Sequence, residues 1–171
     1  MRYVCLLAVL LSFSVLMPAK APVPRPAKEF SCSDADSKPI SVSKFKGKVV
    51  VIQFLITTCS HCQNLSQLLT KLQAEYGPQG FQAFGVAIND ATPGMLTGYI
   101  KDHNLGIPVG SATRDQAIRY LGISEMERLL VPQVMIIDRT GIVREQSDAQ
   151  GTANLQNEAY LRELIGGLLK R

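Results

Sequence analysis

The stretch KVVVIQFLITTCSHC, residues Lys48 to Cys62, joins an apolar run, interrupted by Gln53, to a pair of cysteines. The run carries β-branched residues at successive positions, which predicts a central β-strand covered on both faces. Leucines at helical spacing follow the cysteines through Tyr76, and Gly77 and Pro78 then end the expected helix. The two cysteines are therefore expected at the point where a strand gives way to a helix.

Short apolar runs and amphipathic segments alternate over the rest of the chain, which is typical of an α/β fold. The pattern predicts a strand at 81–88, helices at 93–103 and 114–121, a hairpin with strands at 133–138 and 142–146, and an amphipathic helix at 156–169. Because 171 residues with 46% apolar content fill one core and not comfortably two, we expect a single domain over residues 30–171.

The N-terminal residues differ in composition from this domain. Arg2 precedes an apolar run from Tyr3 to Met17, so we interpret residues 1–21 as a signal peptide or an uncleaved anchor. The run is shorter than the roughly 20 residues that a spanning helix needs. Residues 22–29 are proline-rich and predict an extended tether. We therefore expect a periplasmic or otherwise extracytoplasmic protein, tethered to the membrane if the segment is retained.

The charged residues argue against a nucleic-acid partner. The formal net charge of +4 comes from 18 basic and 14 acidic residues that are mixed along the chain. A run of Lys or Arg typical of a nucleic-acid interface is missing from the sequence. We expect a monomer with no nucleic-acid partner.

The arrangement of these elements resembles the thioredoxin superfamily. GKVVVIQFLITTCSHC, the later Val131-Pro132 pair and IIDRTG are similar to the exported TlpA-like thiol–disulfide oxidoreductases. The resemblance implies a thioredoxin fold, a central mixed β-sheet flanked by helices, here with an N-terminal extension. It also implies an enzyme that exchanges disulfides with protein thiols through a CxxC dithiol, recharged by an upstream redox partner and without a cofactor.

The sequence departs from this family's pattern near the cysteines. Leu55 and Thr58 replace two tryptophans of the typical string, which weakens aromatic packing around the site. Gln53 stands where thioredoxin carries a buried aspartate. Because an amide cannot accept a proton from Cys62, proton transfer needs water or another acceptor.

The CxxC motif assigns different roles to its two thiols. At the start of a helix, Cys59 meets unpaired backbone N–H groups and the positive end of the helix dipole, which favour its thiolate. Cys62 lies about one turn later, within bonding distance but shielded from solvent. Cys59 is thus the expected nucleophile and Cys62 the resolving cysteine. Protonated His61 adds a positive charge, and DsbA-like oxidants carry histidine at this place, so the pair leans towards an oxidant.

The Val131-Pro132 pair is a weak motif alone, but its position after the third predicted helix strengthens it. The superfamily places a cis-proline facing the CxxC there, so the resemblance implies a cis bond before Pro132 and a Val131 backbone that pairs with an extended substrate. Cys32 alternates with Phe30 and is expected to fill apolar space in the core. His103 is expected to be a helix C-terminal residue.

Two alternatives of similar fold stay open. A copper-delivery protein uses three residues between its cysteines and a distant histidine, whereas the spacing here is two. A peroxiredoxin-like antioxidant needs a threonine three residues before its attacking cysteine and a proline earlier still, and Ile56 and Ile52 occupy those places. One CxxC pair and two histidines are too few ligands for a closed zinc site, so we expect no metal.

Overall fold

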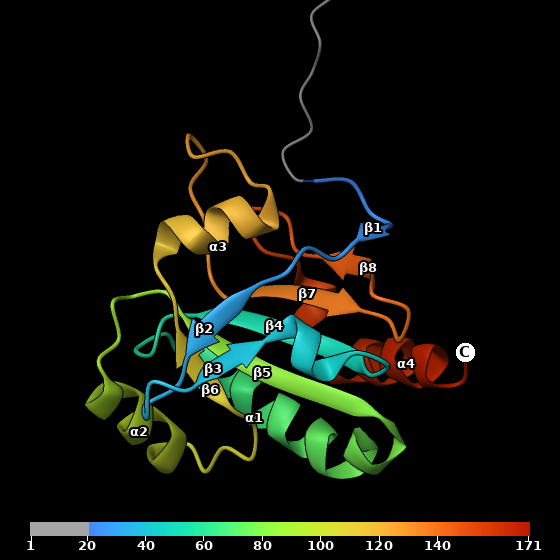
Figure 1. Ribbon diagram of the computed structural model, residues 1–171, viewed down its shortest axis with the longest axis horizontal. Helices are drawn as coiled ribbons and strands as arrows, with labels where there is room; N and C mark the ends of the chain where they lie inside the picture. Colours follow the sequence, from blue (N-terminus) through green and yellow to red (C-terminus); the bar gives the residue numbers. More distant parts are fainter. Residues whose placement is uncertain (1–20) are drawn as a thin grey trace, which may run out of the picture.

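The computed structural model describes residues 21–171, so the export segment predicted for residues 1–21 lies, except for Ala21, outside the described residues. Between residues 21 and 171, no helix is long and apolar enough to cross a membrane. The described chain forms one eight-stranded sheet with the strand order β1-β8-β7-β4-β5-β6-β2-β3 and helices on both faces (Figure 1). The predicted architecture, a mixed sheet flanked by helices, is confirmed.

The helices and strands have well-defined bounds. The strands are β1 Arg25–Pro26, β2 Ser31–Ser33, β3 Pro39–Ser41, β4 Val49–Leu55, β5 Phe81–Ala87, β6 Val109–Ser111, β7 Gln133–Ile137 and β8 Ile142–Gln146. The α-helices are α1 Ser60–Tyr76, α2 Pro93–Asp102, α3 Arg114–Leu121 and α4 Glu158–Leu169. Short 3-10 helices cover Val42–Phe45, Gly77–Gln79 and Ala153–Gln156.

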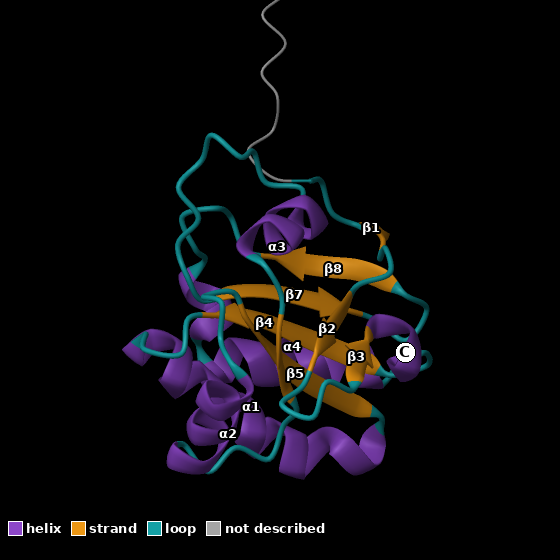
Figure 2. Cartoon of the chain, turned by 60° about the vertical axis from the view of Figure 1, so that its left-hand side comes forward, coloured by secondary structure: helices purple, strands orange, loops and turns teal. Residues whose placement is uncertain are grey.

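Strand β4 lies at the centre of the sheet and organises both sides of the core. It runs parallel to β5 and antiparallel to β7, and all seven of its residues are buried. Because side chains alternate along a strand, Val50, Ile52 and Phe54 pack on the face covered by α3 and the N-terminal strands. Val49 and Val51 pack on the opposite face, against α1 and α4. Figure 2 shows α3 and α1 on opposite sides of the sheet.

The short strands were missed by the sequence analysis. β2 and β3 form a small hairpin, and β6 joins this hairpin to β5. Each of the three has only three residues. An alternating pattern needs at least four residues to stand out, so these strands are defined by their pairing partners and not by local sequence.

Part of the proline-rich segment is attached to the sheet. β1 pairs with β8 and forms the edge of the sheet there, and the Ala27 N–H donates to the Gly141 carbonyl over 2.8 Å. The Arg25 guanidinium donates to Gln146 Oε1 over 2.5 Å. Residues 25–27 therefore belong to the sheet edge, a contact that the expectation of an extended tether over residues 22–29 did not include.

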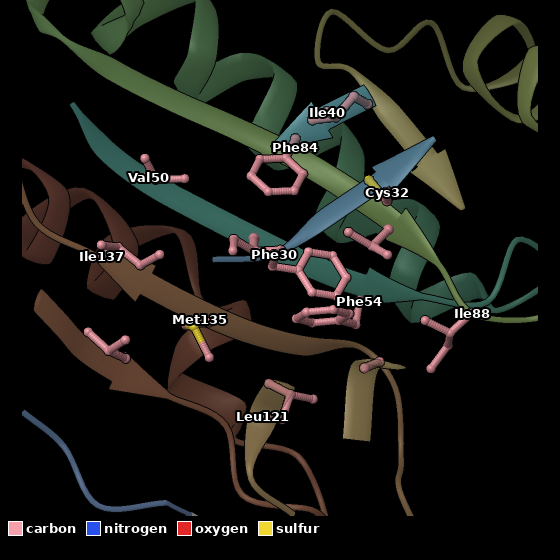
Figure 3. Close-up of a cluster of buried hydrophobic side chains, with 14 of the residues drawn as sticks. Phe30, Cys32, Ile40, Val50, Phe54, Phe84, Ile88, Leu121, Met135 and Ile137 are labelled. Atoms are coloured by element: carbon pink, nitrogen blue, oxygen red, sulfur yellow. The ribbon is translucent and has the colours of Figure 1, made fainter. Parts of the chain in front are cut away.

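Cys32 lies in the apolar cluster under α3, as predicted. It is 4% exposed and belongs to the same cluster as Phe30 and Phe54, whose rings approach edge to face with centroids 5.4 Å apart (Figure 3). Burial, with a smaller contribution from Asp34, raises the pKa of the Cys32 thiol to about 12. Since Cys62 belongs to a different cluster, Cys32 is a core residue separate from the CxxC pair.

Candidate active site

The CxxC motif occupies the turn between β4 and α1, as the sequence predicted. Cys59 is the N-cap residue of α1, with extended backbone angles of φ −86° and ψ 116°. Its N–H donates to the Ile56 carbonyl, and its own carbonyl accepts the first helical bond from Gln63, both over 3.0 Å. The next three N–H groups have no partner inside the helix. Together with the helix dipole, they make this end of α1 favourable for an anion.

The two thiols lie in different environments. Both are free thiols, and Cys59 is partly exposed whereas Cys62 is fully buried. Burial raises the pKa of Cys62, and its hydrogen-bonding contact with Cys59 raises it further, while a bond from the Ile56 backbone only partly opposes these effects. The exposed thiol is thus the accessible one, and the buried thiol lies directly against it.

The segment before β7 meets the CxxC motif in space. The peptide bond between Val131 and Pro132 is cis, and Cys59 Sγ lies 4.0 Å from the Val131 carbonyl oxygen. Val131 is half-buried and packs against the cluster that contains both Cys59 and Cys62. The fold therefore brings together residues that are 72 positions apart in the sequence.

The two histidines lie on different helices, His61 on α1 next to the cysteines and His103 at the end of α2. His61 is exposed in the first turn of α1, two residues after Cys59. His103 is the C-cap residue of α2, as predicted, and its ring packs edge-on against Tyr99 with centroids 5.0 Å apart. Within residues 21–171, no three His, Cys, Asp or Glu side chains gather closely enough to hold a metal ion.

Asn89 and Gln63, which the sequence analysis missed, hold the loop before Cys59 through Thr57. Asn89 Nδ2 donates to Thr57 Oγ1 over 3.0 Å, and the Thr57 N–H reaches Asn89 Oδ1 at 3.4 Å. Gln63 Nε2 donates to the Thr57 carbonyl over 2.9 Å. Asn89 follows β5, which is parallel to β4, so the ends of both strands meet at one edge of the sheet. The available sequence signal for Asn89 was its position as a polar residue directly after the strand predicted at 81–88.

Gln133 fixes the segment that precedes Pro132 and was also missed. Its side-chain amide is fully buried and donates to the carbonyls of Leu130, Asp148 and Ala149, at 2.7, 2.9 and 3.2 Å. The Leu130 N–H in turn donates to the Ala149 carbonyl over 2.9 Å. The segment facing Cys59 is therefore tied to the turn that follows β8.

Gln53, which the sequence marked as a departure, has a defined set of partners. It is fully buried on β4, and its Nε2 donates to the Cys62 backbone carbonyl over 2.8 Å. Its Oε1 accepts from Ser66 Oγ over 2.8 Å, and Ser66 Oγ lies 2.8 Å from the Tyr99 hydroxyl. The amide thus contacts the backbone of the buried cysteine, and no local motif pointed to Ser66 or Tyr99.

Selective alkylation should distinguish the three cysteines of the described chain. We expect iodoacetamide at neutral pH to modify Cys59 in the folded, reduced protein, because it is the partly exposed thiol. Cys62 and Cys32 should stay unmodified, since both are buried and burial raises their pKa values. Mass mapping after timed alkylation measures this, with urea-unfolded protein as the control in which all three react. Modification of Cys62 before Cys59 would contradict the assignment.

Comparisons with known proteins agree with this geometry. Residues 23–146 match the AhpC/TSA family. The thiol-disulfide oxidoreductase ResA of Bacillus thuringiensis subsp. konkukian is 25% identical over 145 residues, which cover 85% of this chain and 80% of that protein. The chain is thus similar to a curated oxidoreductase over most of both lengths.

Solved structures show the same fold. A thiol:disulfide interchange protein of the thioredoxin family from Chlorobium tepidum has a TM-score of 0.67 and 25% identity, over 87% of this chain and 99% of that one. A protein described as a putative protein disulfide isomerase from Bacteroides thetaiotaomicron has a TM-score of 0.70 and 19% identity, over 88% and 91% of the two chains. These similarities confirm the fold class that the sequence predicted.

Proposed function

The chain belongs to the AhpC/TSA family, and we propose that it uses Cys59 and Cys62 as a redox-active dithiol that exchanges disulfides with protein thiols. It is a thiol–disulfide oxidoreductase of the thioredoxin superfamily, similar to the TlpA-like branch. One observation carries the proposal. A partly exposed cysteine caps α1 beside a cis-proline segment, with a buried second cysteine in contact beneath it.

The proposed reaction follows from the different burial of the two thiols. The Cys59 thiolate attacks one sulfur of a substrate disulfide, forms a mixed disulfide, and releases the other substrate sulfur as a thiolate that takes up a proton. Cys62 then loses its proton to water and attacks Cys59 Sγ. This step breaks the mixed disulfide, releases the second substrate thiol, and leaves a Cys59–Cys62 disulfide. Reversed, the same steps oxidise a substrate dithiol.

The surroundings of Cys59 support a polypeptide as the substrate. We propose that the Val131 backbone pairs with an extended substrate segment, with Pro132 holding the turn open towards Cys59. Leu130, the residue before Val131, is 36% exposed and offers apolar contact area next to this backbone.

The place of action remains part of the proposal. The apolar segment within residues 1–21 supports export to the periplasm or another extracytoplasmic site, with a membrane tether if that segment is retained. An upstream redox partner would then restore the active form of the dithiol, since the protein turns over only if its cysteines are recharged. We propose that the protein works as a monomer without a metal or a cofactor.

A peroxiredoxin-like peroxidase is the second candidate, since that related family shares this kind of fold. The residue three positions before Cys59 is Ile56, which has no hydroxyl group to hold a peroxide. The direct test compares two substrates in separate assays, insulin disulfides with dithiothreitol as reductant and hydrogen peroxide with the same reductant. We expect catalysed insulin reduction and peroxide consumption close to the uncatalysed rate. Rapid peroxide consumption with no insulin reduction would favour the peroxidase.

The reduction potential of the Cys59–Cys62 pair should depend on His61. If a positive imidazole stabilises the Cys59 thiolate by about 1 to 2 kcal/mol, His61→Pro should lower the reduction potential by roughly 20 to 45 mV. The variant would then be more reducing, because the thiolate-containing reduced form loses stabilisation. Equilibration with glutathione redox buffers measures the potential of both proteins. An unchanged potential in His61→Pro would assign His61 no part in tuning the pair.

A further inference from the structure

A chain of three buried polar side chains connects helix α2 to the backbone of the resolving cysteine. Gln53 on β4 and Ser66 on α1 are fully buried, and Tyr99 on α2 is 4% exposed. Three contacts of 2.8 Å join the Cys62 carbonyl, Gln53, Ser66 and Tyr99 in that order. Each residue comes from a different element, so the chain links β4, α1 and α2 directly behind the CxxC turn.

Only one arrangement of protons satisfies all three contacts. A backbone carbonyl can only accept, so the NH₂ group of Gln53 faces Cys62 and the amide oxygen faces Ser66. Ser66 therefore donates its single proton to Gln53 Oε1 and must accept from the Tyr99 hydroxyl. Burial raises the pKa of Tyr99 to about 12, although its bond with Ser66 opposes the shift, so Tyr99 remains a proton donor near neutral pH.

These contacts attach the first turn of α1, which carries Cys62, to the neighbouring elements. Cys62 and Ser66 are four residues apart, so they lie one turn apart on the same face of α1. Gln53 bonds to both of them and fastens the first turn of α1 to the central strand. Tyr99 then fixes Ser66 from the side of α2. Where thioredoxin carries a carboxylate, this protein has a neutral amide whose donor and acceptor are both engaged.

We propose that Gln53, Ser66 and Tyr99 are positioning residues for Cys62, which hold its turn of α1 in place so that the buried thiol can attack Cys59. The inference rests on the proposed dithiol exchange and adds residues to that site. To close the disulfide, the two sulfurs must come to about 2 Å from one another. Because misplacement by about 1 Å can cost a factor of about 100 in rate, loosening this turn should slow the second step of exchange. The first step, attack by Cys59, does not use the Cys62 backbone.

The test separates these two steps with oxidised glutathione as the disulfide. Reduced protein is mixed with oxidised glutathione, and the release of the first and second glutathione thiols is followed by rapid quenching and mass analysis. The first release reports attack by Cys59, and the second reports attack by Cys62 on the mixed disulfide. The key variant is Gln53→Met, which keeps a side chain of similar length and removes both hydrogen-bonding groups.

Gln73→Met provides a matched control on the same helix. Gln73 Nε2 donates to the Phe81 carbonyl and its Oε1 accepts from the Ala83 N–H, so this amide also fastens α1 to a strand. It lies eleven residues, or about three turns, beyond Cys62. The control therefore removes a similar attachment of α1 to the sheet, away from the cysteines.

In Gln53→Met we expect the second release to slow at least about ten-fold, with the first release within about two-fold of the wild type. Ser66→Ala should show the same selective slowing, and Tyr99→Phe a smaller one of about two- to five-fold, because Ser66 still reaches Gln53 in that variant. Because Tyr99→Phe keeps the aromatic ring that packs in the core, this variant tests the inference if Gln53→Met does not fold. Gln73→Met should leave the ratio of the two rates unchanged.

The possible failures have different signatures. Lower thermal stability in Gln53→Met and Tyr99→Phe with an unchanged ratio of the two rates would make the three residues merely structural and overturn the inference. Equal slowing of both releases would also overturn it, since it would show a general disturbance of the site. If the wild-type protein itself releases no second glutathione, the proposed dithiol exchange fails instead.

Discussion

Replacing Cys59 with serine is expected to abolish disulfide exchange, with a loss of at least about a thousand-fold, because a serine hydroxyl cannot form the mixed disulfide. Replacing Cys62 with serine should have a different effect. Cys59 is still the accessible thiol at the start of α1 and still attacks, but nothing beneath it resolves the product. The Cys62→Ser protein should therefore accumulate as a stable mixed disulfide with its substrate.

Insulin reduction and non-reducing electrophoresis measure the two outcomes. Cys32→Ala is the matched control, since Cys32 is a buried thiol of the other face of the sheet. This control should be somewhat less stable but should exchange disulfides at the wild-type rate. Covalent trapping of substrate through Cys32, or full activity in Cys59→Ser, would show that the reactive thiol has been wrongly assigned.

The long elements of the fold could be predicted from the sequence because their hydrophobic periods were clear. The apolar run of β4, in which Gln53 is the one polar residue, identified the central strand, and the leucine spacing after Cys62 identified α1. The bounds of α3, Arg114–Leu121, agree with the prediction, since Thr113 forms a capping box with Gln116 and Gly122 ends the helix in a left-handed conformation. Strong local signals at both ends of a helix make its bounds predictable.

The attachment of the N-terminal segment could not be predicted in this way. A proline-rich stretch favours extended backbone whether or not it has a partner. In the structure, Arg25 reaches Gln146, 121 positions away, and this contact has no counterpart in the local pattern. Pairing across such a separation depends on the finished sheet edge, which one sequence does not reveal.

The candidate site was only partly predictable for the same reason. Cys59, Cys62 and the Val131-Pro132 pair follow from local motifs and from a family resemblance. The residues that hold these groups, among them Asn89, Gln133 and Tyr99, each form a bond to a position well away from their own in sequence. An asparagine after a strand or a tyrosine on a helix is common in any protein, so its role becomes visible only when its partner lies beside it.

The core on the α3 side should be the most sensitive part of the fold, and Phe54→Ala tests it. The Phe54 ring is fully buried, and its centroid lies 5.4 Å from that of Phe30 and 6.2 Å from that of Tyr120. Removing a buried phenylalanine side chain typically costs about 3–5 kcal/mol. Since domains are stable by only about 5–15 kcal/mol, the variant should lose a large part of its free energy of unfolding.

Urea denaturation of reduced wild-type and variant proteins at pH 7 measures this loss. Phe45→Ala is the control, because Phe45 is only partly buried and has one neighbouring ring, Phe84, at 5.6 Å. The same atoms are removed, so a clearly smaller loss there assigns the difference to burial. Phe54 faces away from Gln53 and α1 because side chains alternate along β4, so the folded Phe54→Ala protein should keep its rate of disulfide exchange. A loss below about 1.5 kcal/mol would mean that the core closes around the cavity, and would refute the central role given to this ring.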